Sequence, residues 1–378
     1  MAHLYRSLMI GLLVLAASWT TLSMASVGPR ARMERTITRE FKSFQNPVIR
    51  LNTQKGQLKF RSWDETRILI QITVTSEADT KSQAENGLDM VNIITIKSGE
   101  MMHIETDFQD QGDKSSFWNL IKFWEDNLKL TVDMVINVPV NTMYDLTHRY
   151  GDLILPNIRS GKVNIKYGSV NSGHVRENLD LTATYSKGSI GDLSHGTVLL
   201  QYSDFTFGNL DHGDIVAEYS KFRSLDSDEM KVTSKYSSMI IGVVNDFTLD
   251  GKFDKVEIEE TNNVKIYTKY TAIDIGKVRS NIEIINSYQS TKVRYVLPGF
   301  QNIRIVGKYG NCVLGFKGSP NADFELETRY GNIEVPGDAK IISKDASNSH
   351  KLVKGRLGQG GEKINVVNSY GNITLEYQ

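Results

Sequence analysis

The sequence predicts an all-β protein whose main part is a right-handed, single-stranded parallel β-helix, or β-solenoid. Two observations carry this: twelve aromatic residues recur at steps of 17 or 18, then 21 and finally 40 residues, and each follows an alternating apolar run. A short fixed period is typical of stacked repeats, because each unit completes its core only against its neighbours. We therefore expect coils of 17–21 residues. The aromatics are Tyr150, Tyr167, Tyr185, Tyr202, Tyr219, Tyr236, Phe253, Tyr270, Tyr288, Tyr309, Tyr330 and Tyr370.

Each repeat reads as two short strands separated by turns. Apolar residues precede the aromatic by four and two positions, as Val163 and Ile165 precede Tyr167, and others follow it by three and five. Strand side chains alternate, so these positions share one face with the aromatic. A hairpin array would double the period, whereas one β-helix coil per repeat fits it. Coils stacked at ~4.8 Å would bring the aromatics into a ladder inside or at a corner of the solenoid.

The ladder has two interpretations. The alternation groups the tyrosines with the apolar positions, which favours a ladder that holds the coils together by stacking. The alternative is an exposed aromatic strip that stacks on sugars or bases. The 40-residue step before Tyr370 leaves room for one degenerate copy of the repeat.

The first 25 residues read as a secretory signal. Arg6 supplies a positive start, Leu8 to Ala17 a short apolar core, and Ser23 to Ala25 a small-residue cleavage site. The apolar run is short for a membrane span of ~20 residues, although an uncleaved anchor is the alternative. We expect an exported protein in the periplasm, on the outer surface or outside the cell, with no transmembrane span after the signal.

The remaining chain divides by pattern. Residues 26–46 read as a flexible leading segment, residues 47–148 as a strand-rich cap region with a short helix at 79–89, and residues 149–378 as the solenoid. Residues 337–362, rich in Gly, Ser, Lys and Asn, read as a loop insertion between late coils. The strand at 373–377 is expected to leave the C-terminal end of the solenoid open.

Residues 115–125 form an amphipathic segment within the cap region. Its apolar residues recur at the spacing of one helical face. The segment either covers the open end of the solenoid, which needs protection from edge pairing, or contacts a membrane or partner protein. Its apolar members are Phe117, Trp118, Leu120, Ile121 and Trp124.

Composition narrows the possible functions. The 44 basic and 44 acidic residues cancel, so no global field attracts nucleic acid. No nucleophile, metal or phosphate motif is present, and no cofactor is expected. Cys312, the single cysteine, replaces an apolar residue at an inward repeat position and reads as a buried hydrophobe. A carbohydrate-active β-helix enzyme would need clustered carboxylates, for which the candidates are Asp152, Asp192, Asp204, Asp211, Asp214 and Glu218.

One outward position is regularly basic. The residue directly before the aromatic carries a positive charge in seven of the twelve repeats, which stacking would align as a stripe. The stripe is either a solvated surface that discourages sideways aggregation or a groove for an anionic glycan or lipid headgroup. Its members are Arg149, Lys166, Lys235, Lys252, Lys269, Lys308 and Arg329.

The signal-like start, the strand pair after it and the tyrosine repeats together resemble a known protein family. The Asn52 to Asp64 strand pair and the Tyr-Gly-Asn/Asp units at Tyr150, Tyr309, Tyr330 and Tyr370 resemble the bacterial "putative adhesin" family of exported β-solenoids. The resemblance covers residues 47–378 and implies a right-handed β-helix in the bacterial envelope or outside the cell. It transfers no site residues.

These observations favour a non-enzymatic, adhesin-like interaction or scaffold protein of the cell envelope or cell surface. Its partner would be an envelope polymer, a glycan or another envelope protein. The carbohydrate-active enzyme and an envelope regulatory module that binds a protein through residues 115–125 are the alternatives.

Overall fold

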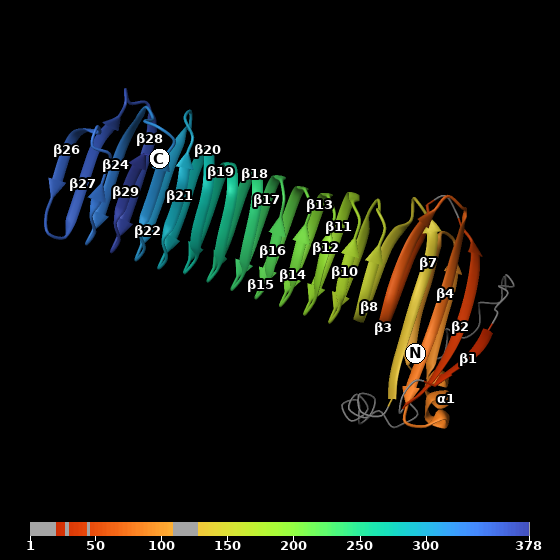
Figure 1. The fold of residues 1–378 in the computed structure, drawn as a ribbon. Helices are drawn as coiled ribbons and strands as arrows, with labels where there is room; N and C mark the ends of the chain where they lie inside the picture. Colours follow the sequence, from red (N-terminus) through yellow and green to blue (C-terminus); the bar gives the residue numbers. More distant parts are fainter. Residues whose placement is uncertain (1–19, 27–29, 44–45, 109–127, 378) are drawn as a thin grey trace, which may run out of the picture. The chain divides into compact units, whose positions relative to one another are not determined.

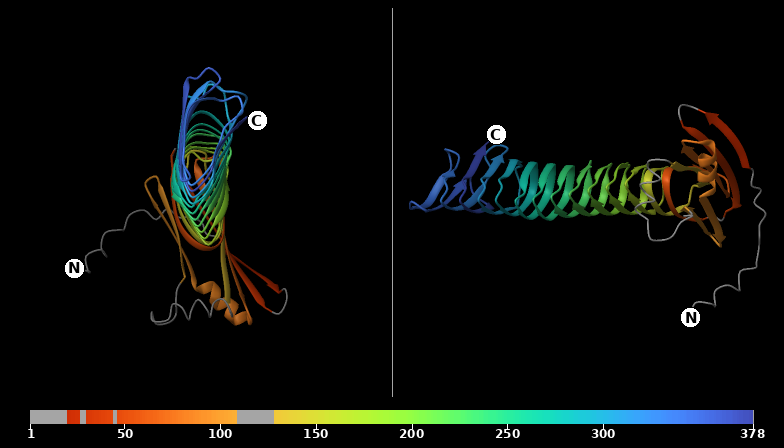
Figure 2. Two further views of the ribbon diagram at one scale, coloured as in Figure 1. Left: turned by 90° about the vertical axis from the view of Figure 1, so that its left-hand side faces the viewer. Right: turned by 90° about the horizontal axis from the view of Figure 1, so that it is seen from below.

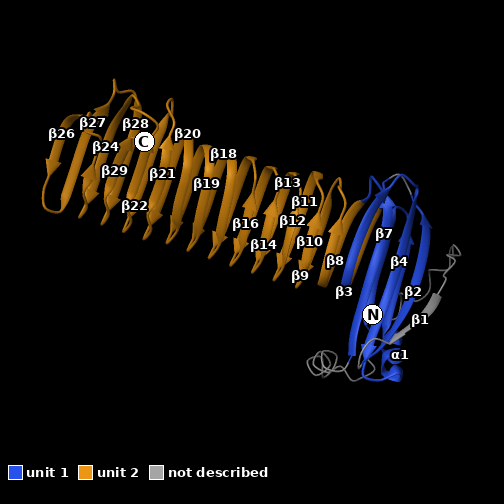
Figure 3. Ribbon diagram, viewed as in Figure 1, with its two compact units in different colours: residues 1–47, 54–142 blue, residues 48–53, 143–378 orange. Residues whose placement is uncertain are grey.

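The computed structural model describes residues 20–26, 30–43, 46–108 and 128–377. They form two compact units, which Figure 3 shows in different colours. Unit 1 contains residues 1–47 and 54–142, and unit 2 contains residues 48–53 and 143–378. Strand β3 (Val48–Trp63) contributes residues to both.

Unit 1 is a mixed sheet with one helix. Strand β4 pairs antiparallel with β2 on one side and β7 on the other, and β7 pairs parallel with the second half of β3. The core of this sheet lies along β4, where Ile70, Ile72 and Val74 are fully buried. The elements are β1 (Thr20–Ser26), β2 (Ala31–Lys42), β4 (Arg67–Ala78), α1 (Lys81–Asp89), β5 (Val91–Ser98), β6 (Met101–Phe108) and β7 (Leu128–Pro139).

The short helix expected at 79–89 is confirmed as α1. Thr80 caps it, since its side chain accepts from the backbone of Gln83 while the Gln83 side chain accepts from the backbone of Thr80. The leading segment departs from expectation: residues 31–42 are not loose but form β2, whose twelve residues all pair with β4. The amphipathic segment 115–125 and residues 1–19 of the signal lie outside the described residues.

Unit 2 is a parallel β-solenoid, as predicted (Figure 1). Each coil has a longer strand before the aromatic and a shorter strand after it, and each strand pairs with its equivalent one coil away. In β18, β19 and β20 one continuous strand spans both sides of the coil. The strands up to this point are β8 (Met143–Leu155), β9 (Gly161–Lys166), β10 (Ser169–Ser172), β11 (Val175–Thr184), β12 (Lys187–Ile190), β13 (Leu193–Gln201), β14 (Asp204–Phe207), β15 (Leu210–Glu218), β16 (Lys221–Ser224), β17 (Ser227–Lys235), β18 (Ser238–Lys252), β19 (Lys255–Lys269) and β20 (Ala272–Ser287).

The core of unit 2 runs down the inside of the coils. Viewed end-on, the coils superimpose as flattened loops (Figure 2). Side chains from the longer and shorter strands meet inside them, as the buried Val198 and Leu200 share the interior with Phe205. In-register pairing stacks equivalent positions, so that Phe205 lies beside Phe222 and Phe222 beside Met239. The apolar offsets predicted before and after the aromatic are therefore the interior positions.

The C-terminal end differs from the prediction of an open end. Strand β28 does not extend the stack but pairs with β22 on one side and β24 on the other, so the last coil lies between two earlier ones. In Figure 1 the C-terminus accordingly lies inside the stack, with β26 beyond it. The remaining strands are β21 (Thr291–Val296), β22 (Asn302–Lys308), β23 (Cys312–Phe316), β24 (Ala322–Arg329), β25 (Ile333–Glu334), β26 (Lys340–Ala346), β27 (His350–Leu357), β28 (Glu362–Ser369) and β29 (Ile373–Tyr377).

The expected loop at 337–362 is also wrong, because most of it is a β-hairpin. β26 and β27 pair antiparallel with each other, and β27 pairs antiparallel with β24. This hairpin occupies the 40-residue step before Tyr370, so no degenerate coil is hidden there. It covers the edge of β24 that is not paired with β28. The outermost strand, β26, is bulged at Ile342 and carries Lys340 and Lys344, features that discourage edge-to-edge aggregation.

Candidate functional site

The twelve aromatics lie at one corner of the solenoid, between the longer and the shorter strand of each coil. All have positive φ, from 49° at Tyr219 to 70° at Tyr288, and Lys55 is the one other described non-glycine residue that does. This left-handed conformation turns the chain sharply and normally favours Gly or Asn. We call these residues, with the one before and the two after each, the tyrosine corner.

Small polar residues complete the backbone hydrogen bonds at this corner. The Ser203 hydroxyl accepts from the Ser186 backbone N–H (3.1 Å) and donates to the Gln201 carbonyl (2.8 Å). Ser220 does the same for Ser203 in the next coil, and Ser237 for Ser220. A buried hydroxyl ladder therefore runs behind the aromatics. The turn residues predicted after the aromatic thus have a specific task, which is to satisfy peptide groups that the sharp turn leaves unpaired.

Asp254 replaces the hydroxyl in one coil. Its carboxylate accepts from the Ser237 backbone N–H and from the Ser234 hydroxyl, both at 2.8 Å. Gly251 makes room for it, because a Cβ there would lie 2.5 Å from the carboxylate. Burial raises the pKa of Asp254, and the hydrogen bonds from Ser237 and Ser234 offset only part of that rise.

The aromatic rings form one continuous stack on the outside of the corner. Neighbouring ring centroids are 4.4–5.2 Å apart, with interplanar angles of 3–18°. The stacked ladder is therefore confirmed. Its expected burial with the apolar positions is wrong, since the rings are 40–62 % exposed, from Phe253 to Tyr330. The positive φ explains the difference, because it interrupts the strand alternation at the aromatic.

Stacking determines what the ladder can offer a ligand. Each inner ring turns its faces to the rings of the neighbouring coils, so face-on stacking of a sugar or base is open only at the ladder's ends. The exposed parts are the electropositive ring edges and the phenol hydroxyls. The pKa of Tyr270 is raised, first by desolvation and then by the neighbouring Tyr288 hydroxyl.

The basic residues predicted as a stripe form part of one column beside the ladder. Register pairs join Arg149 to Lys166 and, farther along, Lys235 to Lys252 and Lys252 to Lys269. Between these two groups the column carries Thr184, Gln201 and Glu218. The column then passes Ser287, Lys308, Ser369 and Arg329, in the order in which the C-terminal coils stack.

Three lysines of this column lie close to the ladder. The ammonium groups of Lys166, Lys235 and Lys308 lie 5.0–5.3 Å from the centroid of the tyrosine ring that follows each. Cation–π attraction at this range is worth ~0.5–1 kcal/mol at an exposed site. The described residues form no ion pair with Lys235, Lys252 or Lys269. Three like charges therefore lie on consecutive coils without an ion pair, and the nearest acidic residue of the column is Glu218, the register partner of Lys235.

A shallow groove of about 760 Å³ follows the ladder on its other side. It runs from Tyr167 to Tyr219 and is floored by the residues that follow them. Charges alternate along it, with Asp152, Lys187, Asp204 and Lys221 on successive or near-successive coils. Sequence reasoning grouped Asp152 and Asp204 with candidate catalytic acids and did not find the groove.

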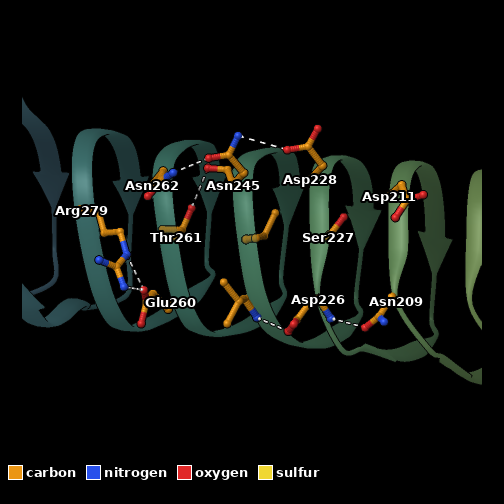
Figure 4. Close-up of a pocket in the computed structure, with 12 residues that line it drawn as sticks. Asn209, Asp211, Asp226, Ser227, Asp228, Asn245, Glu260, Thr261, Asn262 and Arg279 are labelled. Atoms are coloured by element: carbon orange, nitrogen blue, oxygen red, sulfur yellow. Dashed lines mark hydrogen bonds and ion pairs between the residues drawn. The ribbon is translucent and has the colours of Figure 1, made fainter.

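The opposite corner has a second polar surface (Figure 4). Here side chains one coil apart cap backbone groups: Asn209 accepts from the Asp226 N–H, and Asp192 accepts from the Asn209 N–H (2.9 Å). Seven residues after the aromatic, the sequence reads Asn157, His174, Asp192, Asn209 and Asp226, which is a periodic signal that could have revealed these caps.

At the far end of this corner Glu260 forms a partly buried ion-pair cluster. Its carboxylate contacts Arg279 and Lys277, the latter at 3.2 Å, and its side chain is 12 % exposed. Burial raises the pKa of Glu260, but the two cations outweigh it and the net pKa is lowered. The close-up in Figure 4 shows the Arg279 contact beside the Asn245–Asn262 amide pair. Both are structural links between coils.

The remaining predicted residues do not converge. Of the candidate acids, Asp192 caps the opposite corner, whereas Asp214 and Glu218 lie on the outer face of β15. Within the described ranges no three His, Cys, Asp or Glu side chains form a group able to hold a metal ion. Cys312 is buried as predicted, and burial raises its pKa to about 12. No described helix is both long and apolar enough to span a bilayer.

Comparisons with known proteins give structural neighbours alone. No protein family and no curated protein matches the sequence. The chain is similar to solved structures of a "putative cell adhesion protein" from Clostridium sporogenes (10 % identity, 95 % of this chain and 100 % of that one, TM-score 0.16) and a "putative adhesin" from Parabacteroides merdae (12 %, 90 % and 95 %, 0.24). A third is a "putative lipid binding protein" from Parabacteroides distasonis (11 %, 90 % and 96 %, 0.24). Adhesin-like neighbours are those expected from the sequence, but at these TM-scores they carry no argument about a ligand.

Proposed function

We propose that this chain is an exported, non-enzymatic, adhesin-like protein that binds an extended anionic glycan of the cell envelope along its tyrosine corner. The observation that carries the proposal is the exposed, unbroken ladder of twelve aromatic rings beside unpaired lysines. Export rests on the signal-like pattern of residues 1–25.

The ligand class follows from what the ladder leaves exposed. Hydroxyls and ring edges spaced at ~4.8 Å can donate hydrogen bonds to a chain of oxygen acceptors running along the solenoid. Eleven such steps extend over roughly 53 Å, which suits a linear polymer better than a compact molecule. Because inner ring faces are covered, the recognition is by edges, and a planar base or a face-on sugar is disfavoured.

The charge pattern favours an anionic ligand. Lys235, Lys252 and Lys269 place one cation per coil beside the ladder, and none of the three forms an ion pair with a described carboxylate. Carboxylates or phosphates on a polymer would supply the missing partners and form charge-assisted hydrogen bonds. The exposed setting means that salt should weaken the binding.

The test is binding of the chain from Ser26 onward to teichoic-acid-type and uronic-acid polymers, measured at low and high salt. Replacing Lys235, Lys252 and Lys269 with Gln should weaken binding at low salt by about tenfold or more, equivalent to ~1.4 kcal/mol. The matched control replaces Lys292, Lys340 and Lys344, which are exposed elsewhere on unit 2, and should bind like the parent.

Three results would contradict the proposal. Equal losses in both triple variants would indicate a general charge effect, and unchanged binding in the first would remove the stripe from the site. Binding only to vesicles of anionic lipid, with none to free polymer, would replace the glycan by a membrane headgroup.

A further inference from the structure

The C-terminal coil occupies a slot between two coils that precede it in the sequence. β28 pairs with β22 through Lys308 and Ser369 and with β24 through Arg329 and Ser369. On the other side of the coil β29 fits between β23 and β25. The Tyr370 ring likewise stacks between Tyr309 (4.8 Å) and Tyr330 (5.0 Å). The last sixteen described residues therefore complete the stack from the middle.

The slot is a strong binding site for this segment. Ile364, Val366, Ile373 and Leu375 are at most 2 % exposed within it, and the backbone of β28 is paired on both edges. Without the segment, β22 and β24 would present two facing parallel edges and an apolar interior. Such a gap accepts a strand of matching sequence, whichever molecule supplies it.

A glycine-rich hinge leads into the segment. Gly358, Gly360 and Gly361 have positive φ, and the hinge crosses the end of β24. Leu357 on one side and Glu362 on the other both pair with Ala322. Side chains of β24 and the residue before it hold the hinge, since Asn321 accepts from the Gln359 N–H (2.9 Å) and Asp323 from the Gly361 N–H (3.4 Å). Two backbone bonds add to these, from the Gly360 N–H to the Leu357 carbonyl (3.1 Å) and from the Glu362 N–H to the Asn321 carbonyl (3.3 Å), so a change of hinge path breaks only a few hydrogen bonds.

We propose that the C-terminal coil, Glu362–Tyr377, is an exchangeable element that inserts into the slot of a second copy of this chain. The exchanged contacts are identical to those within one chain, so only the hinge and the association differ. Reciprocal exchange joins two copies into a closed dimer, the commonest symmetric assembly. The inference rests on strand topology and is independent of the proposed ligand.

Hinge length provides the main experiment. Leu357 and Glu362 are separated by two strand spacings, roughly 9.6 Å. Deleting Gly358, Gln359 and Gly360 leaves two Cα–Cα steps, about 7.6 Å at most, so the coil can no longer reach its own slot. The full chain from Ser26 with this deletion should have the molar mass of two chains by light scattering, at every concentration at which it is folded. A matched variant with three glycines inserted after Gly360 should resemble the parent. A folded deletion variant that stays monomeric at every concentration would overturn the proposal.

A second experiment keeps the natural hinge, in case the deletion prevents folding. Arg304 and Asn365 are exposed register partners on β22 and β28. Chains carrying R304C or N365C, each with C312A, are mixed at high protein concentration under mild oxidation. Exchange predicts a disulfide between residues 304 and 365 of different chains, identified by peptide mass spectrometry and increasing with concentration. The double variant R304C/N365C is the control for geometry and should close within one chain. Closure in that control with no link in the mixture would contradict exchange.

Discussion

The two corners of the solenoid solve the same backbone problem with different residues. At the tyrosine corner, buried hydroxyls such as Ser203 pair the peptide groups of the turn, and the large side chain points outward. At the opposite corner, exposed Asn and Asp side chains such as Asn209 cap the next coil, and no large residue is required. The second corner shows that coils of this length can turn with small polar residues alone.

The comparison bears on why tyrosine is present. A left-handed residue other than Gly costs roughly 1–2 kcal/mol, and eleven coils accept that cost for tyrosine. Ring stacking returns ~0.5–1.5 kcal/mol per contact, which offsets the strain without clearly exceeding it. The backbone conformation therefore does not require tyrosine at this position. Gly or Asn could adopt it as well, but neither would place a row of phenol hydroxyls on the surface.

The largest effect on stability is expected at the opposite corner, from Glu260→Gln. The change removes charge-assisted hydrogen bonds to Arg279 and Lys277 and should lower the free energy of unfolding by about 1.5–3 kcal/mol at pH 7. The pKa of Glu260 is lowered in the fold, so its contribution is present above the unfolded pKa and is lost as pH falls through the folded pKa. Denaturant melts of parent and variant should therefore converge towards pH 3. A difference that persists there would point to packing.

A smaller loss is expected at the tyrosine corner from Ser203→Ala. The change leaves the Ser186 N–H and the Gln201 carbonyl without their buried partner, and it should lower the free energy of unfolding by about 1–2 kcal/mol. Asn209→Ala is the matched change at the opposite corner. Water can replace the exposed Asn209 cap, so that variant should lose less than about 0.5 kcal/mol. Equal losses in urea melts would show that burial does not distinguish the corners.

Asp254→Asn, unlike the changes above, should increase stability at pH 7. Burial raises the pKa of Asp254, so the folded state holds the proton more tightly and the parent loses stability as pH rises from the unfolded pKa through the folded one. Asn keeps an acceptor for the Ser237 N–H without a charge. The variant should melt above the parent at pH 7, and the gain should disappear at pH 3. A lower melting temperature at pH 7 would mean that the charged hydrogen bonds outweigh desolvation.

The sequence predicted the repeat, the interior positions and the stacking, because all three depend on residue spacing. It could not predict ring exposure, since strand alternation assumes extended backbone and Tyr150 to Tyr370 each break it with a positive φ. The groove beside Tyr167 also escaped prediction, because its charged residues become neighbours only when coils stack.

The C-terminal rearrangement had even less signal in the sequence. The Tyr370 repeat looks like any other, and nothing local tells β28 to pair with β22 in place of extending beyond β24. The irregular 40-residue step marked the place correctly. That step contains a hairpin, and the sequence does not predict it because the hairpin pairs with a strand edge that becomes exposed only after the coils have stacked.

The sharpest test of the comparison is expected at Tyr219, where strain relief and lost stacking nearly cancel. Tyr219→Gly relieves about 1–2 kcal/mol of left-handed strain while losing two stacking contacts worth about 1–3 kcal/mol together, so the free energy of unfolding should fall by about 0.5 kcal/mol at the middle of these ranges and by about 2 kcal/mol at most. Tyr219→Phe keeps the stack, as Phe253 does naturally, and removes only the hydroxyl. Each lost hydroxyl contact should weaken glycan binding by about two- to tenfold, since one hydrogen bond is worth ~0.5–1.5 kcal/mol. If Tyr219→Gly instead unfolds the chain while Tyr219→Phe binds like the parent, the ladder is a structural brace and the two corners differ only in how they hold the coils.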